Sequence, residues 1–291
     1  MKPYRLTRIA TLVAMLSTGP AHALDVDAGD YTALPAGTNL ALLYYQHASR
    51  DALYQHGRRA DLDAGLTSDI GIFRAVHFAD VADHRIDVQF LLPFGRLEGK
   101  DDLATMGTAH GMGDLILASA VWLLNSPDTG RYFGITPYLF LPTGNYDRHD
   151  ALNLGENRWK LVLQAGYITP LSKTVTLDVV ADATLFGDND DFGISGATLE
   201  QKPLYQFQTF LRYHVSPQWD LRAGLSHAFG GETSVDGVDQ DDRTRTTKAN
   251  VGTAWFATPS VQVVFNYGRD LSVENGLRED NRVNLRLLKV F

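Results

Sequence analysis

The sequence contains no cysteine and, beyond its first two dozen residues, no long apolar run. Without cysteine there is no disulfide and no thiol chemistry in an oxidising compartment, and the usual zinc–thiolate sites are excluded as well. No stretch after residue 23 approaches the roughly 20 apolar residues that a membrane helix needs. The rest of the chain therefore folds either as a soluble protein or as a barrel that crosses a membrane with strands.

Basic residues are also in the minority, with 26 Lys and Arg against 34 Asp and Glu and a formal net charge of −8. Three of the bases precede a short apolar stretch at 9–17, and Pro20 and Ala21-His22-Ala23 follow. This is the pattern of a secretory signal peptide that is cleaved near Ala23. Removing the three bases lowers the formal charge from −8 to −11, which argues against a nucleic-acid partner.

Apolar and polar residues alternate with a period of two along nearly the whole remaining chain. In residues 61–72, mostly apolar side chains at even positions alternate with Asp61, Asp63 and Asp69 at odd positions. Successive side chains of a strand point to opposite faces, so such a segment has one apolar face and one acidic face. Similar segments recur about twelve times, an even number in the range of bacterial outer-membrane barrels.

The connections between these segments alternate in length. The short ones are 79–83, 125–131, 170–173, 216–218 and 257–260. The long, polar ones are 49–58, 98–110, 143–157, 187–202, 230–242 and 272–280. A soluble sandwich has no reason to keep this order, whereas short periplasmic turns and long extracellular loops are typical of a membrane barrel. We therefore predict an all-β fold: a transmembrane antiparallel β-barrel of about 12 strands over 38–291, after a signal peptide over 1–23 and an N-terminal periplasmic or lumenal segment over 24–37.

Aromatic residues mark the predicted strand ends and the end of the chain. Those that suit interfacial girdles are Tyr44, Tyr45, Trp122, Tyr132, Trp159, Trp219 and Trp255. The last residue, Phe291, follows Val283, Leu285 and Leu287 at the same parity. A terminal aromatic in this pattern resembles the assembly signal of outer-membrane proteins. We therefore expect the barrel-assembly machinery to recognise Phe291.

The polar face of each strand lines the lumen if the apolar face meets lipid. The inward acids are then Asp61, Asp63, Asp69, Asp87, Asp114, Asp178 and Asp182. The inward bases are Lys160, Arg212, Arg222, Lys248, Arg282 and Arg286. Acids dominate the early strands and bases the late ones, so they occupy different arcs of the wall. Two interpretations stay open: a transverse field across a narrow aqueous pore, or a salt-bridged plug that seals the barrel.

Motifs for catalysis or cofactor binding are missing. The chain has no phosphate loop, dinucleotide fingerprint or zinc-binding helix motif. Ser226 and His227 are strand neighbours that face opposite sides, which disfavours the nucleophile–base pair of a lipid hydrolase. Asp188, Asp190 and Asp191 could bind calcium, but the incomplete ligand spacing favours a solvated turn. We predict no enzyme, no cofactor and no metal site.

Several short motifs resemble a known family. They are PAG at 35–37, LYY at 43–45, GMGDL at 111–115, LPTGNYD at 141–147 and LGENRW at 154–159. In these motifs and their spacing the chain is similar to the meta-pathway phenol-degradation outer-membrane proteins. The resemblance implies a transporter that passes aromatic or other hydrophobic compounds across the outer membrane, and it supplies no catalytic residues.

We therefore predict a protein of the bacterial outer membrane that acts as a channel for small organic, hydrophobic or aromatic, compounds. Outer-membrane lipids and such a solute are the expected partners. One alternative is a closed structural or adhesive barrel that works through its extracellular loops. The other is an outer-membrane lipid hydrolase, which would need a catalytic pair that the sequence does not supply.

Overall fold

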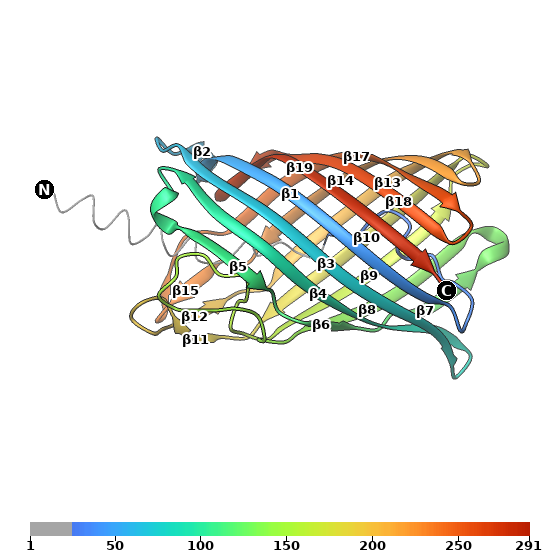
Figure 1. The fold of residues 1–291 in the computed structure, drawn as a ribbon, viewed down its shortest axis with the longest axis horizontal. Helices are drawn as coiled ribbons and strands as arrows, with labels where there is room; N and C mark the ends of the chain where they lie inside the picture. The colour runs from blue at the N-terminus through green and yellow to red at the C-terminus, as the bar shows by residue number, and fades with distance from the viewer. Residues whose placement is uncertain (1–24) are drawn as a thin grey trace, which may run out of the picture.

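The computed structural model describes residues 25–291, so the predicted signal peptide and its cleavage site lie outside the described residues. This part of the chain forms a closed antiparallel barrel of 12 wall strands (Figure 1). Within residues 25–291, no helix is long and apolar enough to cross a membrane. The predicted fold class is confirmed.

The wall is built almost entirely from consecutive, antiparallel neighbours. Its continuous strands are β1 (Asn39–Gln55), β3 (Ala64–Val81), β4 (His84–Asp101), β8 (Arg131–Phe140), β9 (Lys160–Pro170), β10 (Val175–Phe186), β13 (Leu204–Ser216), β14 (Trp219–Gly230), β17 (Thr244–Thr258), β18 (Val261–Val273) and β19 (Gly276–Val290). One further wall strand is broken into β5 (Thr108–Met112), β6 (Ile116–Ala118) and β7 (Val121–Ser126). Pairing of β1 with β19, from Leu40 opposite Val290 to Tyr54 opposite Gly276, closes the barrel.

The two ends of the barrel differ. Short turns, one of them the 3-10 helix η2 (Pro127–Thr129), lie at the end where Asn39 and Phe291 meet. Long loops lie at the other end and contain η1 (Ala104–Met106) and the small strands β2 (Arg58–Arg59), β11 (Asn189–Phe192), β12 (Ala197–Gln201), β15 (Thr233–Val235) and β16 (Val238–Asp239). The last four pair into a small separate sheet. We call the two ends the short-turn end and the long-loop end.

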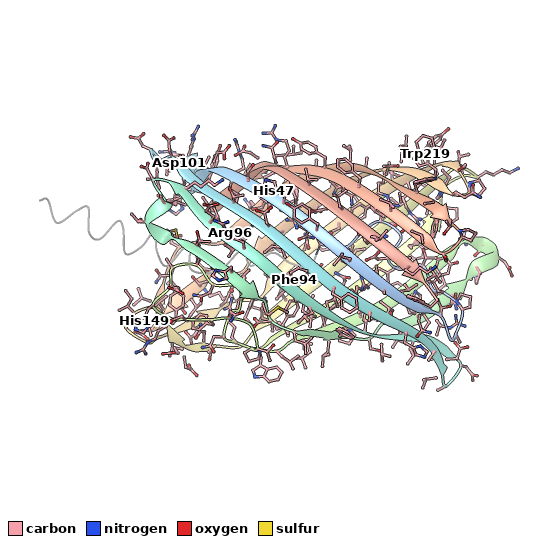
Figure 2. All side chains as sticks on the ribbon, in the orientation of Figure 1. His47, Phe94, Arg96, Asp101, His149 and Trp219 are labelled. Atoms are coloured by element: carbon pink, nitrogen blue, oxygen red, sulfur yellow. The ribbon has the colours of Figure 1, made fainter. Side chains whose placement is uncertain are left out.

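Alternation within the strands separates an apolar outer surface from a polar interior. In β10, Val179 and Leu185 are exposed on the outside, whereas Asp178, Val180 and Asp182 are buried inside. Exposed apolar side chains continue this band around the wall, among them Leu43, Phe90, Leu163, Phe207, Leu225 and Phe265 (Figure 2). The β-branched and aromatic residues of this band also favour strands. Because the barrel is closed, no strand edge with unpaired backbone groups is exposed to lipid.

The first half of β3 faces the opposite way from our prediction. Leu66, Ser68 and Ile70 point inward, so Asp69 lies on the outer surface. There its carboxylate accepts hydrogen bonds from Tyr45 Oη at 2.6 Å and pairs with His47 Nδ1 at 2.8 Å. The reason is that Leu66 and Ile70 pack against Leu97 and the long loop that follows β8, which fills this part of the barrel with an apolar core. Parity alone cannot distinguish such a core from lipid.

Asp61 and Asp63 were also assigned wrongly to the lumen. Both are exposed in the connection that precedes β3, outside the wall strands. The Asp63 carboxylate lies 3.8 Å from the exposed Arg59 guanidinium. The alternating pattern runs past the end of the strand into the loop, and it therefore overstated the length of the lumenal face.

The aromatic girdle is also smaller than expected. Trp159, Trp219 and Trp255 are exposed on the outside. Trp122 and Tyr132, by contrast, are buried inside the barrel. Trp122 faces inward because it packs against Phe78 and binds the segment that enters the lumen, described next.

Candidate functional site

The N-terminal segment lies inside the barrel. Residues 25–37, which we call the lumenal strap, run along the inner wall before β1 begins. Ala28, Tyr31 and Ala33 of the strap are buried. Gly29 has a φ of +93° in the left-handed region, and the Asp30 amide donates to the Asp27 carbonyl at 3.1 Å, so the strap turns at this point. Residues 25–33 therefore lie against the inner wall, whereas Pro35, Ala36 and Gly37 are exposed.

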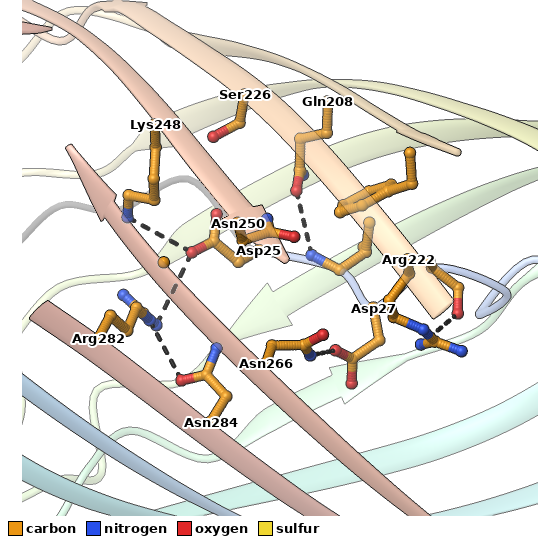
Figure 3. Close-up of a pocket in the computed structure, with 14 residues that line it drawn as sticks. Asp25, Asp27, Gln208, Arg222, Ser226, Lys248, Asn250, Asn266, Arg282 and Asn284 are labelled. Atoms are coloured by element: carbon orange, nitrogen blue, oxygen red, sulfur yellow. Dashed lines mark hydrogen bonds and ion pairs between the residues drawn. The ribbon is translucent and has the colours of Figure 1, made fainter. Parts of the chain in front are cut away.

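Three acids of the strap meet bases on the late strands. Arg286 Nη1 on β19 lies 2.8 Å from Asp27 Oδ2 and 2.7 Å from Asp30 Oδ1. Asp25 Oδ2 lies 3.6 Å from Lys248 Nζ and 3.7 Å from the Arg282 guanidinium (Figure 3). These pairs are enclosed by the wall, so salt screens them far less than pairs on a surface.

Neutral hydrogen bonds fix the strap to the other side of the barrel. Tyr31 Oη contacts Thr136 Oγ1 at 3.2 Å and Gln164 Oε1 at 3.1 Å. Trp122 Nε1 donates to the Tyr31 carbonyl at 2.8 Å. The Tyr31 ring occupies the space above Gly166, where a Cβ would lie 2.1 Å from the ring, so β9 requires glycine at this position.

The wall also holds the backbone of the strap. The Gly29 amide donates to Asp178 Oδ2 at 2.6 Å, and Asp178 Oδ1 accepts from Arg212 Nη2 at 2.9 Å. Arg222 Nη1 donates to the Ala28 carbonyl at 3.0 Å. Polar contacts thus reach the strap from β3, β7 to β10, β13, β14, β17, β18 and β19, and it is packed as part of the interior.

The structure places the predicted lumenal residues as follows. The side chains directed inward are Asp87, Asp114, Asp178, Asp182, Lys160, Arg212, Arg222, Lys248, Arg282 and Arg286. Asp61, Asp63 and Asp69 are not among them. The sequence left open whether the inward charges make a transverse field across a pore or a salt-bridged plug; in the structure the bases of β17 and β19 meet the strap and Glu279.

Sequence reasoning missed the acids that matter most for this arrangement. Asp25, Asp27 and Asp30 precede the first strand and were not considered as partners of the wall. Their spacing in a short segment opposite a base-rich half of the wall was the available signal. Arg74 on β3, which lies 3.2 Å from Asp30, was also missed. The inverted parity of this strand assigned its even-numbered positions to the lipid side.

A second cluster of paired charges lies on the long-loop side of the strap. Glu279 is 0% exposed, and its carboxylate forms ion pairs with Arg50, with Lys248 at 3.0 Å and with Arg282 at 3.1 Å. The Glu279 amide donates to Asp270 Oδ2 at 2.7 Å. A buried carboxylate with three basic partners is a rigid arrangement, because the loss of one partner would leave charge unpaired in a medium of low dielectric constant.

A sizeable cavity lies on the short-turn side of the strap. A cavity of about 580 Å³ is lined there by strap residues and by the wall. Leu40, Leu42, Val76, Phe78 and Leu288 give it one apolar side, and its other side carries His214, Gln218, Asp220 and Gln262. The spaces of about 40 and 70 Å³ that flank Asp25 and Asp27 are much smaller. Residues within 28–35 of the strap thus line this cavity, while Asp25 meets the partners of Glu279.

Three of the family-like motifs meet where the broken strand leaves a gap in the wall. Asp114 accepts hydrogen bonds from the Gly144 amide at 2.9 Å and the Glu156 amide at 3.0 Å. A Cβ on Gly144 would lie 2.7 Å from the Gly113 carbonyl carbon and 2.8 Å from Gly155 Cα. The glycines thus let the loop over 141–159 cover the wall between β5 and β8.

Glu156 is the charged centre of this loop. Its carboxylate accepts from Arg158 Nη2 at 2.8 Å and pairs with Lys160. Burial raises the pKa of Glu156, but the Lys160 and Arg158 charges outweigh burial and lower it to about 2. The loop is therefore held by an ionised carboxylate under ordinary conditions.

The hydrolase pair and the calcium loop that the sequence raised find little geometric support. Ser226 is buried inside the barrel. His227 lies on the outer side, where its Nδ1 forms a hydrogen bond of 2.9 Å with Thr247 Oγ1. Asp191 is engaged by Arg148 at 2.7 Å, and Asp190 accepts from Thr198 at 3.3 Å. Among residues 25–291, no group of three or more metal-ligating side chains is placed to hold an ion.

The closed barrel and its polar interior define the protein as an outer-membrane β-barrel of the channel class. A family model described as "Putative MetA-pathway of phenol degradation" matches residues 49–287, and the chain belongs to this family. The predicted family is confirmed. A comparison with curated protein sequences gave no significant match.

Solved structures agree with this assignment. An outer membrane channel from Pseudomonas putida F1 is 45% identical with a TM-score of 0.88, over 92% of this chain and 100% of that chain. The β domain of the Bordetella autotransporter BrkA is 11% identical with a TM-score of 0.55, over 88% of this chain and 100% of that one. The second likeness shows a shared barrel fold alone. The first supports location in the outer membrane.

Proposed function

We propose that the barrel passes small organic molecules, hydrophobic or aromatic, through the outer membrane. The observation that carries the proposal is the cavity of about 580 Å³ at the short-turn end, which has one apolar and one polar side. Ligand sites are commonly 300–1,000 Å³, mostly apolar, with a few polar groups that orient the ligand. A planar ring with one hydroxyl group would place the ring on the apolar side of the cavity and the hydroxyl group on its polar side. The description of the family also names phenol degradation.

The strap controls passage in this proposal. A solute that enters from the long-loop end meets the Glu279 cluster and the strap before it reaches the cavity. The small spaces beside Asp25 and Asp27 do not admit an aromatic ring, so the strap has to shift for transport. The outward apolar band contacts outer-membrane lipid, and the assembly machinery recognises Phe291.

Uptake by intact cells tests the proposed cargo. Cells of a porin-deficient strain that express the protein should take up labelled phenol faster than cells with an empty vector, with no comparable gain for labelled glucose. Leu42→Gln, in the apolar side of the cavity, should lower the gain for phenol. Asp128→Asn, in an exposed turn away from the cavity, is the matched control. Equal gains for phenol and glucose, or no gain for either, would contradict the proposal.

One observation favours a second function, a closed barrel that acts through its loops: the strap and the Glu279 cluster fill the lumen with paired charges. Recordings in planar bilayers distinguish the two. A chain lacking residues 25–34 should conduct if the strap is a gate. If the folded deletion variant is as silent as the intact protein, the closed barrel is the better description.

A further inference from the structure

A histidine, a carboxylate and a serine lie together on the outer surface of the wall. His47 Nδ1 on β1 lies 2.8 Å from Oδ1 of Asp69, the residue directly opposite on β3. Because an ionised carboxylate only accepts, Nδ1 carries the proton of the neutral ring and Nε2 is its basic nitrogen. Ser49 follows His47 by two residues, so both side chains are on the same face of β1. Sequence reasoning missed this spacing and considered only Ser226 and His227 as a hydrolase pair.

Hydrogen bonds hold the groups around this site in place. Asp69 Oδ1 also accepts from Tyr45 Oη at 2.6 Å, which fixes the carboxylate beside the ring. On the other side of β1, Asn281 Nδ2 of β19 lies 3.5 Å from Ser49 Oγ. Tyr267 Oη donates to Asn281 Oδ1 at 2.7 Å and so turns the NH2 group of this amide toward the serine. An amide N–H in this place stabilises the oxyanion that forms when a serine attacks an ester.

The site lies where the apolar band of the wall gives way to polar residues. Toward the short-turn end, Leu43 on β1 and its pairing partner Phe73 on β3 are 50% and 39% exposed. Toward the long-loop end, which is extracellular in such barrels, Asp51 is exposed. Arg96 on β4, directly opposite Asp69, is 55% exposed on the outer surface (Figure 2). A lipid of the outer leaflet with its acyl chains on the apolar band and its phosphate near this cation has its ester bonds between the two.

We propose that Ser49, His47 and Asp69 hydrolyse acyl esters of outer-leaflet lipids, an activity separate from the transport proposed above. In the structure Ser49 Oγ contacts Asn281, so the reaction begins with rotation about the Cα–Cβ bond of Ser49 toward His47. His47 Nε2 then takes the hydroxyl proton while the serine oxygen attacks the ester carbonyl carbon. The C–O bond to the lipid alcohol breaks, and His47 returns the proton to the leaving oxygen. Water attacks the acyl-serine in the same way, which releases a fatty acid and restores the serine.

Release of a labelled fatty acid tests this activity. The mature protein is refolded into phosphatidylglycerol vesicles that contain a phospholipid with a fluorescent acyl ester, and it should release the fluorescent fatty acid. Lipopolysaccharide offers the same combination of acyl ester and phosphate, and mass spectrometry of its acyl chains after incubation distinguishes the two sources. Hydrolysis of either lipid supports the proposal, and hydrolysis of neither overturns it.

Variants separate catalysis from a structural ion pair. Ser49→Ala should reduce hydrolysis to the rate of empty vesicles, and His47→Ala should lower it about a hundredfold or more. Asp69→Asn should also lower the rate, because an amide does not hold the histidine in the basic tautomer as firmly. His227→Ala is the matched control, because within residues 25–291 this outward histidine contacts Thr247 and no carboxylate. All four variants should keep the heat-modifiable shift of the wild type.

A serine-directed fluorophosphonate tests the nucleophile without any substitution. It should label Ser49 in the folded wild type and leave the boiled protein unlabelled, because only the folded site activates the hydroxyl. Peptide mapping identifies the labelled residue. Hydrolysis that persists in Ser49→Ala, or a label that does not map to Ser49, would overturn the proposal.

Discussion

Glu156 illustrates how a single buried charge stabilises a loop that the wall strands leave unsupported. Its amide binds Asp114, and its carboxylate binds Arg158 and Lys160. The low pKa of Glu156 means that folding favours the ionised form. A carboxylate whose folded-state pKa lies below its unfolded value adds stability above the unfolded value, and that stability disappears as the pH falls through the folded one.

The first prediction follows from this loss of stability at low pH. Between pH 4.5 and about 2, the loop over 141–159 should lose up to about 3 kcal/mol of stability as Glu156 becomes protonated. Pepsin cleavage within 143–157, scaled to cleavage of the boiled protein, should therefore rise steeply as the pH approaches 2. Glu156→Gln should be cleaved readily across this range. Glu274→Gln, in another loop, is the control and should keep the wild-type profile; identical profiles for all three proteins would contradict the argument.

The lumenal strap is the element on which the proposed transport depends. It has no regular secondary structure, and its position is set by contacts to many separate wall strands. Its acids form ion pairs with bases of β17 and β19, so part of the positive charge of the wall holds the strap in place. Apart from the Gly37 amide, which donates to the Phe78 carbonyl at 2.8 Å, the described contacts of the strap with the wall involve side chains, so residues 25–34 can leave their site without breaking the hydrogen bonds between the wall strands.

The second prediction concerns the charges that hold the strap. In the double variant Asp27→Asn and Asp30→Asn, Arg286 and Arg74 lose their acidic partners. Single-channel conductance should rise severalfold, and reversal potentials in a salt gradient should shift toward anions because the unpaired bases remain. Asp128→Asn is the control for charge alone. If a correctly folded double variant conducts like the wild type, the strap does not gate the pore.

At the scale of the whole molecule, barrel closure and the outward apolar band determine where the protein resides. Pairing of β1 with β19 satisfies the backbone of both terminal strands. The interior is polar and ion-paired, while the middle of the outer wall is apolar. These two surfaces make the same amino-acid type tolerable or harmful according to the side of the wall on which it lies.

The third prediction tests this difference. Val179 is 41% exposed on the outer side of β10, and Val179→Arg should cost about 2–4 kcal/mol near the bilayer midplane. Val215→Arg lies on the outer side of β13 near the short-turn end, where the cost falls to about 0–1 kcal/mol. Refolding into lipid vesicles, followed by the heat-modifiable shift on detergent gels, should give a lower folded fraction for Val179→Arg only. Equal yields would mean that β10 faces lipid differently.

Much of the architecture could be read from the order of the residues. The period-two alternation and the alternation of short and long connections led to the strand count, the closed barrel and the two different ends. These features depend on local geometry, because a strand places successive side chains on opposite faces whatever its neighbours are. The family-like motifs were recognised from their spacing in the same way.

Only the tertiary structure decided what lies opposite each inward face. Asp69 points outward because Leu66 and Ile70 meet a loop that fills the barrel, and no local pattern distinguishes that loop from lipid. The bases Lys248, Arg282 and Arg286 were recognised as inward from sequence, yet their partners are more than 200 residues away in the strap. Alternation determines which residues share a face of a strand, whereas the side of the wall that this face meets, and the partners of its residues, depend on how the chain closes on itself.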